Sequence, residues 1–268
     1  MFLFAQHNNF YFHPMVSAKN VKYWIENYKW WEMMHKKYNY LSARETLMML
    51  EVRNADWTNE AIQDYKNFID FLMTDAYNMV NQNSKELTKI VLNAEDYPIT
   101  SSYLPWNLNF MTTFMGCSSS NTLTIRAGDL AICPCHRTSY NKFLYGKFIV
   151  DNDKIVDIEA NNVQAAIRML LSNNNLCSFR CDTCPINPIC IKGCFGSQLE
   201  NTGDPFMPVP NVCHFFEEKY KFLIQEYRKF GIIDCLEEIS VYNPTFLTIH
   251  SLLKTIYKLE DYYGLGTK

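Results

Sequence analysis

Apolar residues in the first hundred positions switch between strand-like and helix-like spacing. Phe10–Met15 is a short apolar run of strand length, and Asn20–His35 repeats apolar residues every three to four positions. Leu47–Val52 is nearly continuously apolar, as expected of a parallel strand that is buried on both faces. Thr58 then precedes a second helical stripe and is a suitable N-cap. This order of strand, helix, strand and helix predicts an α/β fold with a parallel sheet covered by helices.

We interpret both helical stripes as core faces. Spacings of three and four place their apolar residues on one side of each helix. The first stripe consists of Val21, Trp24, Ile25, Tyr28 and Trp31, and the second of Ile62, Tyr65, Ile69, Leu72, Ala76 and Met79.

The pattern changes to short paired runs after about residue 120. Leu123–Arg126 and Leu130–Cys133 flank the turn sequence Ala-Gly-Asp, which predicts a β-hairpin. Phe148–Val150 and Lys154–Ile158 flank Asp-Asn-Asp and predict a second hairpin. Helical spacing returns in three later segments, Val163–Leu171, Phe215–Phe230 (with Tyr220, Leu223, Ile224 and Tyr227 inward) and Phe246–Tyr262.

Composition narrows the class of protein. Of 268 residues, 48% are hydrophobic and 20% charged, which is typical of a globular chain. A net charge of −3 gives no indication of a nucleic-acid or membrane-surface footprint. The N-terminus has no basic and apolar leader pattern, and no apolar run is long enough to span a membrane. We therefore expect a cytoplasmic protein.

The cysteines divide the chain. There are ten cysteines, and all except Cys235 lie between residues 117 and 213. The segment 97–107, which Pro98 and Pro105 interrupt, is the expected boundary before them. A secreted disulfide scaffold is the less favoured explanation, because a chain of this size does not need disulfide bonds to stabilise its fold. Clustered cysteines in a cytoplasmic protein more often bind metal or perform redox chemistry.

The densest cluster is CDTCPINPICIKGC, which starts at Cys181 and ends at Cys194. Its spacing is Cys-x2-Cys-x5-Cys-x3-Cys. Two intervening residues allow one turn to direct both thiolates of the first pair at one ion. Thiolates suit zinc and iron alike, and nine cysteines are enough for two four-thiolate sites. Residue types alone leave zinc sites and iron–sulfur clusters both open.

The full order and spacing of the cysteines between residues 117 and 213, with Gly128, resemble the SPASM domain. That domain is the C-terminal auxiliary iron–sulfur module of radical S-adenosylmethionine (radical SAM) enzymes that modify peptides and proteins. The resemblance implies two [4Fe–4S] clusters with interleaved ligands. A loop cluster would use Cys181, Cys184, Cys190 and Cys213, and a hairpin cluster would use Cys117, a cysteine after the first hairpin, and Cys194.

The cysteine after the hairpin is ambiguous. Cys133 fits the Gly-x4-Cys spacing, whereas Cys135 stands in the Pro-Cys pair that the family usually has. We favour Cys135, which leaves Cys133 as a buried strand thiol or a fourth ligand. Some family members take a fourth ligand from six residues before the first cysteine, where this chain has Met111. The hairpin cluster then has an open iron or recruits Cys133 or Cys177.

The N-terminal part resembles the last strands and helices of a partial radical SAM barrel. The stretch MLEVRNADWT, which contains Arg53, resembles the final barrel strand and the loop after it, so Arg53 is a candidate cofactor-binding residue. His7 and His13 would lie at the barrel edge. The Cys-x3-Cys-x2-Cys loop that binds the initiating cluster is absent. S-adenosylmethionine and a third cluster are thus expected only in a complete parent enzyme.

His136 and Arg137 follow Cys135 directly. A cation near an anionic cluster raises its reduction potential and could position an anionic substrate group. We favour the simpler interpretation of a solvated His-Arg pair without such a role. Sulfatase-maturing relatives carry an acidic residue at the position of His136, so this chain departs from that subgroup.

The sequence thus predicts three regions: a partial barrel remnant (1–100), a small α+β SPASM module (108–235) and a helical tail (236–268). The predicted function is that of the auxiliary-cluster portion of a radical SAM peptide maturase, inactive alone. The expected partners are a peptide or protein substrate and the missing radical SAM half, with no nucleic acid and no membrane. The alternatives are a zinc-stapled peptide-binding module without catalysis and an electron-transfer subunit of a split enzyme.

Overall fold

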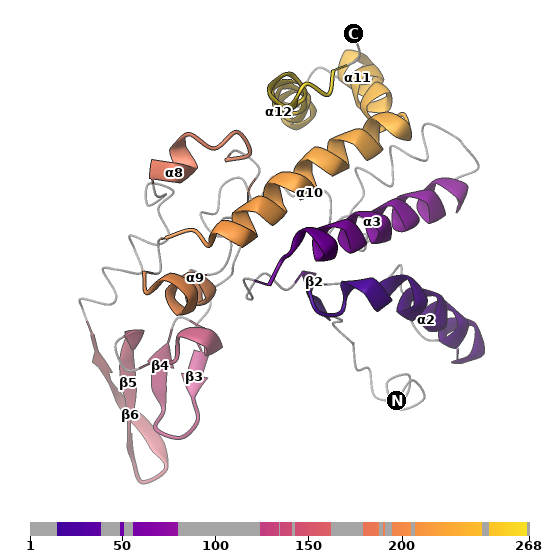
Figure 1. The fold of residues 1–268 in the computed structure, drawn as a ribbon. Coiled ribbons are helices and arrows are strands. Elements are labelled where there is room, and N and C mark those ends of the chain that lie inside the picture. The colour runs from indigo at the N-terminus through magenta and orange to yellow at the C-terminus, as the bar shows by residue number, and fades with distance from the viewer. Residues whose placement is uncertain are drawn as a thin grey trace. The chain divides into compact units, whose positions relative to one another are not determined.

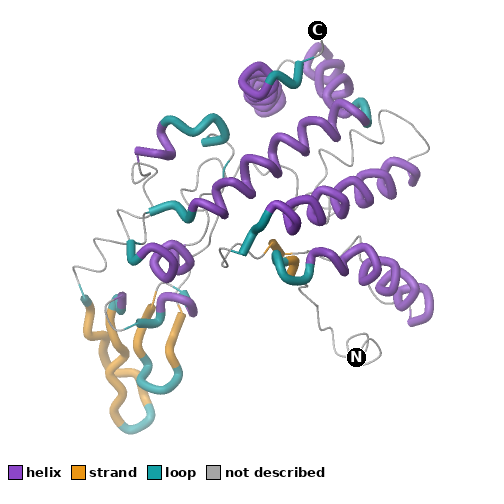
Figure 2. The backbone as a smooth tube through the Cα atoms, in the orientation of Figure 1, coloured by secondary structure: helices purple, strands orange, loops and turns teal. Residues whose placement is uncertain are grey.

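The fold is that of a computed structural model, which describes residues 15–38, 49–50, 56–79, 124–133, 135–140, 143–161, 179–187, 190, 195–204, 207–242 and 247–266 (Figure 1). The chain forms two compact units. We call Met1–Leu108 with Pro210–Lys268 the helical unit, and Asn109–Val209 the sheet unit. Figure 2 shows that helices dominate the described part of the first unit, whereas that of the second combines an antiparallel sheet with short helices. Helices and a small antiparallel sheet make the described fold α+β.

The helical unit begins with the predicted strand, helix, strand and helix. Strand β1 (Met15–Val16) pairs in parallel with β2 (Met49–Leu50). Between them lie the short 3-10 helix η1 (Val21–Tyr23) and helix α2 (Trp24–Tyr38), and α3 (Asn59–Met79) follows β2. The parallel pairing confirms the β-α-β-α order. The described residues contain no further strand of a barrel, so the barrel remnant stays a prediction.

Helix α3 starts where its capping residue indicates. The Thr58 hydroxyl accepts a hydrogen bond from the Ala61 backbone N–H at 3.2 Å, which satisfies one of the unpaired donors of the first turn. The predicted apolar face is buried at Ile62, Tyr65, Ile69 and Leu72. The side chains of Ala76 and Met79 lie outside the described residues.

Helix α10 (Pro210–Lys229) packs against α3 within the helical unit. At the start of α10 the Phe215 ring stacks on Trp57 with centroids 3.9 Å apart, and at its end Phe230 meets Tyr77 at 5.2 Å. The two helices therefore run in the same direction. The predicted helix Phe215–Phe230 and its inward residues are confirmed, since Tyr220, Leu223, Ile224 and Tyr227 are buried.

Two more helices belong to the described part of the helical unit. Gly231 takes a left-handed backbone (φ +68°) and separates α10 from α11 (Ile232–Tyr242), which the sequence pattern did not predict. Helix α12 (Leu247–Tyr263) confirms the last predicted helix. The compact division falls at Val209, whereas the expected module extends to residue 235. The apolar face of α10 explains the difference, because it buries against α3 and not within the sheet unit.

The sheet unit is built on four antiparallel strands in the order β3-β4-β5-β6. The first hairpin joins β3 (Thr124–Arg126) to β4 (Ala131–Cys133), and the second joins β5 (Gly146–Asp151) to β6 (Lys154–Ala160). In the second turn Asn152 and Asp153 have φ of 49° and 60°, which fits a tight hairpin turn. Both predicted hairpins are confirmed. The pairing of β4 with β5, which merges them into one sheet, was not predicted.

Three short helices accompany the sheet: η3 (His136–Thr138), α8 (Phe179–Asp182) and α9 (Phe195–Thr202). The predicted helix Val163–Leu171 lies outside the described residues.

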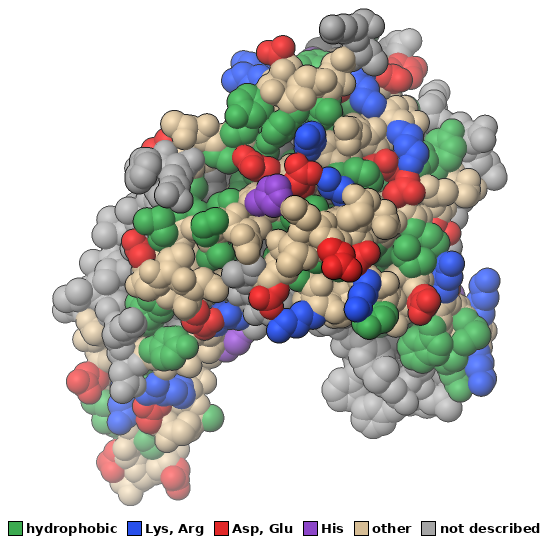
Figure 3. Space-filling view, viewed as in Figure 1, with side chains coloured by type: hydrophobic (Ala, Val, Ile, Leu, Met, Phe, Trp, Pro, Cys, Tyr) green, Lys and Arg blue, Asp and Glu red, His purple; other side chains and the backbone are tan. Residues whose placement is uncertain are grey.

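Acidic and basic side chains are interspersed on the molecular face in Figure 3, in keeping with the small net charge. Across the described segments, every helix is too short or too polar to cross a bilayer.

Candidate metal centre

The segment from Cys181 to Cys190 is a succession of backbone turns. Cys181 lies in α8, and its carbonyl accepts a hydrogen bond from the Cys184 N–H at 3.1 Å. The Cys184 carbonyl accepts one from the Asn187 N–H at 3.1 Å, and the Cys190 N–H donates to the Ile186 carbonyl at 2.8 Å. A bond from residue i to residue i+3 closes a tight turn and keeps the two ends of Cys-x2-Cys close together.

Among the described residues of this loop, Ile186 is the buried apolar side chain. Ile186 is only 1% exposed, whereas Cys181, Cys184 and Cys190 are all half-buried. The loop thus holds its apolar residue inside and leaves its three thiols within reach of solvent. Half-buried thiols on a fixed turn fit the donor set of a thiolate-bound metal centre.

Within the described part of the chain, no three His, Cys, Asp or Glu side chains converge as they would around a bound ion. No disulfide joins any two of the described cysteines either. Because thiolates gather around a metal as it binds, ligation itself would complete a site on Cys181, Cys184 and Cys190.

The structure distinguishes the two cysteines after the first hairpin. Cys133 is fully buried in β4, its thiol lies 3.9 Å from the Ala131 carbonyl, and burial raises the pKa of this thiol. Cys135 is half-buried and has an extended backbone just before η3. These environments favour Cys135 as the ligand and fit the interpretation of Cys133 as a buried strand thiol.

Arg137 is held by α9. Its guanidinium forms an ion pair with Glu200, and its side chain is only 17% exposed. The aliphatic part of the side chain lies against Gly196, where an added Cβ would come within 2.7 Å of the Arg137 Cγ. The interpretation of Arg137 as a solvated residue is therefore wrong, because this side chain joins η3 to the first turn of α9. His136 next to it is exposed.

This contact relates two distant cysteines. Cys135 stands two residues before Arg137, and Cys194 stands two residues before Gly196. Two residues of chain span at most about 7 Å. Packing of Arg137 on Gly196 thus joins the residues that stand two positions after each of these cysteines. The sequence reasoning missed Gly196 and Glu200, although a glycine so soon after Cys194 is a signal of close packing.

The remaining candidates are distributed as follows. Cys213 is exposed in the first turn of α10, in the helical unit. The positions outside the described residues are His7, His13, Arg53, Met111, Cys117, Cys177 and Cys194.

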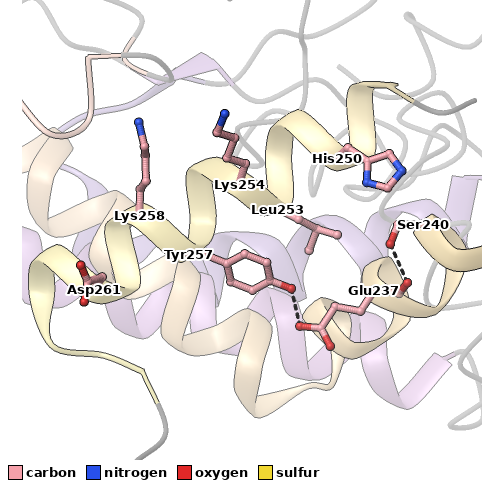
Figure 4. Close-up of a pocket in the computed structure, with 8 residues that line it drawn as sticks. All are labelled: Glu237, Ser240, His250, Leu253, Lys254, Tyr257, Lys258 and Asp261. Carbon is pink, nitrogen blue, oxygen red and sulfur yellow. Dashed lines mark hydrogen bonds between the residues drawn. The ribbon is translucent and has the colours of Figure 1, made fainter. Parts of the chain in front are cut away.

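A second candidate is an open pocket of about 560 Å³ between α11 and α12 (Figure 4). The Tyr257 hydroxyl donates to Glu237 at 2.6 Å, and burial together with this bond raises the pKa of Tyr257 to about 12. Lys254 and Lys258 extend away from this pair in Figure 4. The Glu237 carboxylate is thus already bound by Tyr257, another residue that lines the pocket. We therefore place the candidate site on the cysteines instead.

Comparisons with known proteins add no relative: the chain matches no protein-family model, no curated protein and no solved structure.

Proposed function

We propose that the chain binds two [4Fe–4S] clusters and serves as the SPASM portion of a radical SAM enzyme that modifies a peptide or protein. The proposal starts from the cysteine order between residues 117 and 213. In such an enzyme auxiliary clusters accept electrons or bind substrate. A reducing compartment such as the cytoplasm suits so many thiols.

The packing of Arg137 on Gly196 is the observation that carries the proposal. Two sequential four-cysteine zinc sites would use Cys181, Cys184, Cys190 and Cys194 together, with no need for Cys135 nearby. The interleaved arrangement needs Cys135 and Cys194 in one cluster, and the contact between η3 and α9 joins the residues that stand two positions after each of them in the sequence. It thereby favours the interleaved ligand sets over the sequential ones.

Arg137 has a defined part in this arrangement. Its ion pair with Glu200 fixes η3 on α9, and its charge lies two residues from the proposed ligand Cys135. The residue therefore positions the two ligand segments and is not itself a ligand.

Metal content tests the proposal directly. Anaerobically reconstituted protein should hold roughly eight iron and eight sulfide per chain, as two cubane clusters require. The chain alone should produce no deoxyadenosine from S-adenosylmethionine, because it lacks the initiating cysteine loop. Stoichiometric zinc, or about half that iron after full reconstitution, would contradict the two-cluster proposal.

Single cysteine variants test the division of ligands. Cys213→Ala should lose the same electron paramagnetic resonance signal as Cys181→Ala, and Cys194→Ala the same signal as Cys135→Ala. Cys133→Ala should retain both clusters. If Cys194→Ala behaves like Cys190→Ala instead, the ligand sets are sequential and the zinc-stapled module is the better explanation.

Gly196→Ala tests the contact itself. The added methyl would overlap the Arg137 side chain near its base, so η3 or α9 must shift. We expect this variant to lose about half of its iron, from the hairpin cluster alone. The control is Gly266→Ala, whose added Cβ meets nothing within 4 Å and should leave the iron content unchanged.

A further inference from the structure

Strand β6 is an exposed edge with apolar side chains. It is the last strand of the sheet, and all seven of its residues are exposed. Figure 1 shows β6 at the opposite edge of the sheet from β3. The exposed fractions of Ile155, Val156 and Ile158 are 62%, 57% and 50%. Proteins normally shorten, charge or cover such an edge, because it offers a template for another strand.

The outward backbone groups of β6 alternate with its inward ones. The Phe148 N–H donates to the Leu130 carbonyl, so Phe148 turns its backbone groups towards β4. Its cross-strand neighbour Ile158 correspondingly turns its own groups away from β5. The Ile158 N–H is bound at 2.8 Å by the carboxylate of Asp157, the residue before it. A side chain thus occupies the donor that a neighbouring strand would use.

Charge governs which strand can pair here. Beyond the register shift between Ile149 and Val150, Asp157 and Glu159 lie on one face of β6 and Ile158 on the other, because side chains alternate along a strand. On the inner side, Glu159 already stands opposite a cation, Lys147. A strand added on the outer side with basic residues opposite Asp157 and Glu159, and apolar residues between them, would match both faces.

A second copy of β6 does not match in the two pairings that are centred on its acidic segment. Two antiparallel copies related by a two-fold axis place one residue opposite itself. Centred on Asp157, the pairing sets two Asp157 carboxylates opposite each other. Centred on Ile158, it sets Asp157 opposite Glu159. Like charges directly opposite each other destabilise the pairing.

We propose that β6 binds an extended segment of a partner polypeptide in which basic and apolar residues alternate. The partner strand adds to the sheet, its carbonyl takes the Ile158 N–H, and the released Asp157 carboxylate pairs with a partner cation. This surface is independent of the metal ligands proposed above.

The test is peptide binding to the full chain, measured by fluorescence anisotropy. The probe is a short labelled peptide of alternating lysine and valine. We expect saturable binding that is lost when the amides of its bonding edge are N-methylated, or when its lysines and valines are placed in separate blocks. Equal binding of the N-methylated or block peptide, or no binding of the alternating one, would overturn the proposal. Self-association of the chain through β6 would overturn it as well.

A charge swap tests the recognition. Asp157→Lys with Glu159→Lys should weaken the lysine peptide about tenfold or more and create binding of an alternating glutamate–valine peptide. The control is Glu238→Lys with Asp261→Lys, which changes net charge equally at exposed positions of α11 and α12 and should leave both affinities unchanged. If both double variants weaken peptide binding equally, the affinity depends only on the net charge of the protein. That result would contradict recognition by β6.

Discussion

In the helical unit, Trp57, Tyr65 and Phe215 pack ring against ring between α3 and α10, and each is at most 2% exposed. The sheet unit has no comparable core in its described residues. Its buried apolar side chains there are Ala131, Ile132, Cys133, Tyr145, Ile186 and Val209. Small units with little buried apolar surface often gain stability from structural metals. The contrast fits the concentration of cysteines in that unit.

Metal removal should produce the largest difference in local stability between the two units. If metal supplies the stability of the sheet unit, extraction of the metal by a chelator should increase amide hydrogen exchange in β4 and β5 by about a hundredfold or more. The amides of α3 and α10 should remain protected, because aromatic packing stabilises those helices. Unchanged exchange in β4 and β5 would show that this unit folds without metal.

Loss of the Trp57 side chain should have the opposite effect: it should destabilise the helical unit and leave the sheet unit unchanged. Trp57→Ala leaves a cavity beside Phe215 and should lower the free energy of unfolding of the helical unit by about 3–5 kcal/mol. Denaturant unfolding monitored by helix content measures this change, and iron content should not change. The control Trp30→Ala removes a ring that is 45% exposed and should cost clearly less. Equal losses for the two variants would contradict the assignment of Trp57 to the core.

The ion pair between α10 and α12 should contribute less than this core. Arg228 donates two hydrogen bonds to Glu260, at 2.7 and 2.9 Å, and Glu260 is only 4% exposed. Because the Arg228 side chain is 29% exposed, Glu260→Gln should cost about 2 kcal/mol, less than for a fully buried pair. Lys19→Ala breaks an exposed pair with Asp56 and should cost below about 0.5 kcal/mol. Thermal unfolding of both variants makes the comparison.

The two units also differ in how far the sequence predicted them. Helical periodicity and the Thr58 cap predicted α3, α10 and α12, because the apolar face of a helix is encoded locally. Turn residues likewise predicted both hairpins. The joining of the hairpins through β4 and β5 depends on non-local backbone pairing, which leaves no periodic signal.

The candidate site was predicted as a set of residues but not as an arrangement. Spacing alone identified the thiols of Cys181, Cys184 and Cys190. It could not distinguish Cys133 from Cys135, because burial in β4 is a tertiary property. The role of Arg137 was missed for the same reason, since Gly196 and Glu200 lie about sixty residues away in the sequence and only the fold brings them to η3.

The smallest expected effect is an acid-dependent one in the first hairpin. Arg126 donates to both carboxylate oxygens of Asp129, and this hydrogen bonding lowers the pKa of Asp129 to about 2. The folded-state pKa lies below the ordinary value of 3.8, so the folded state favours the ionised carboxylate. Its contribution to stability is therefore complete above pH 4 and is lost as the pH falls towards about 2. Carboxyl titration by nuclear magnetic resonance should find Asp129 ionised at pH 3, and Arg126→Gln should raise its titration towards the ordinary value. A wild-type Asp129 that titrates at that ordinary value would show that the pair does not persist in solution. The stability of the hairpin would then not depend on this ion pair.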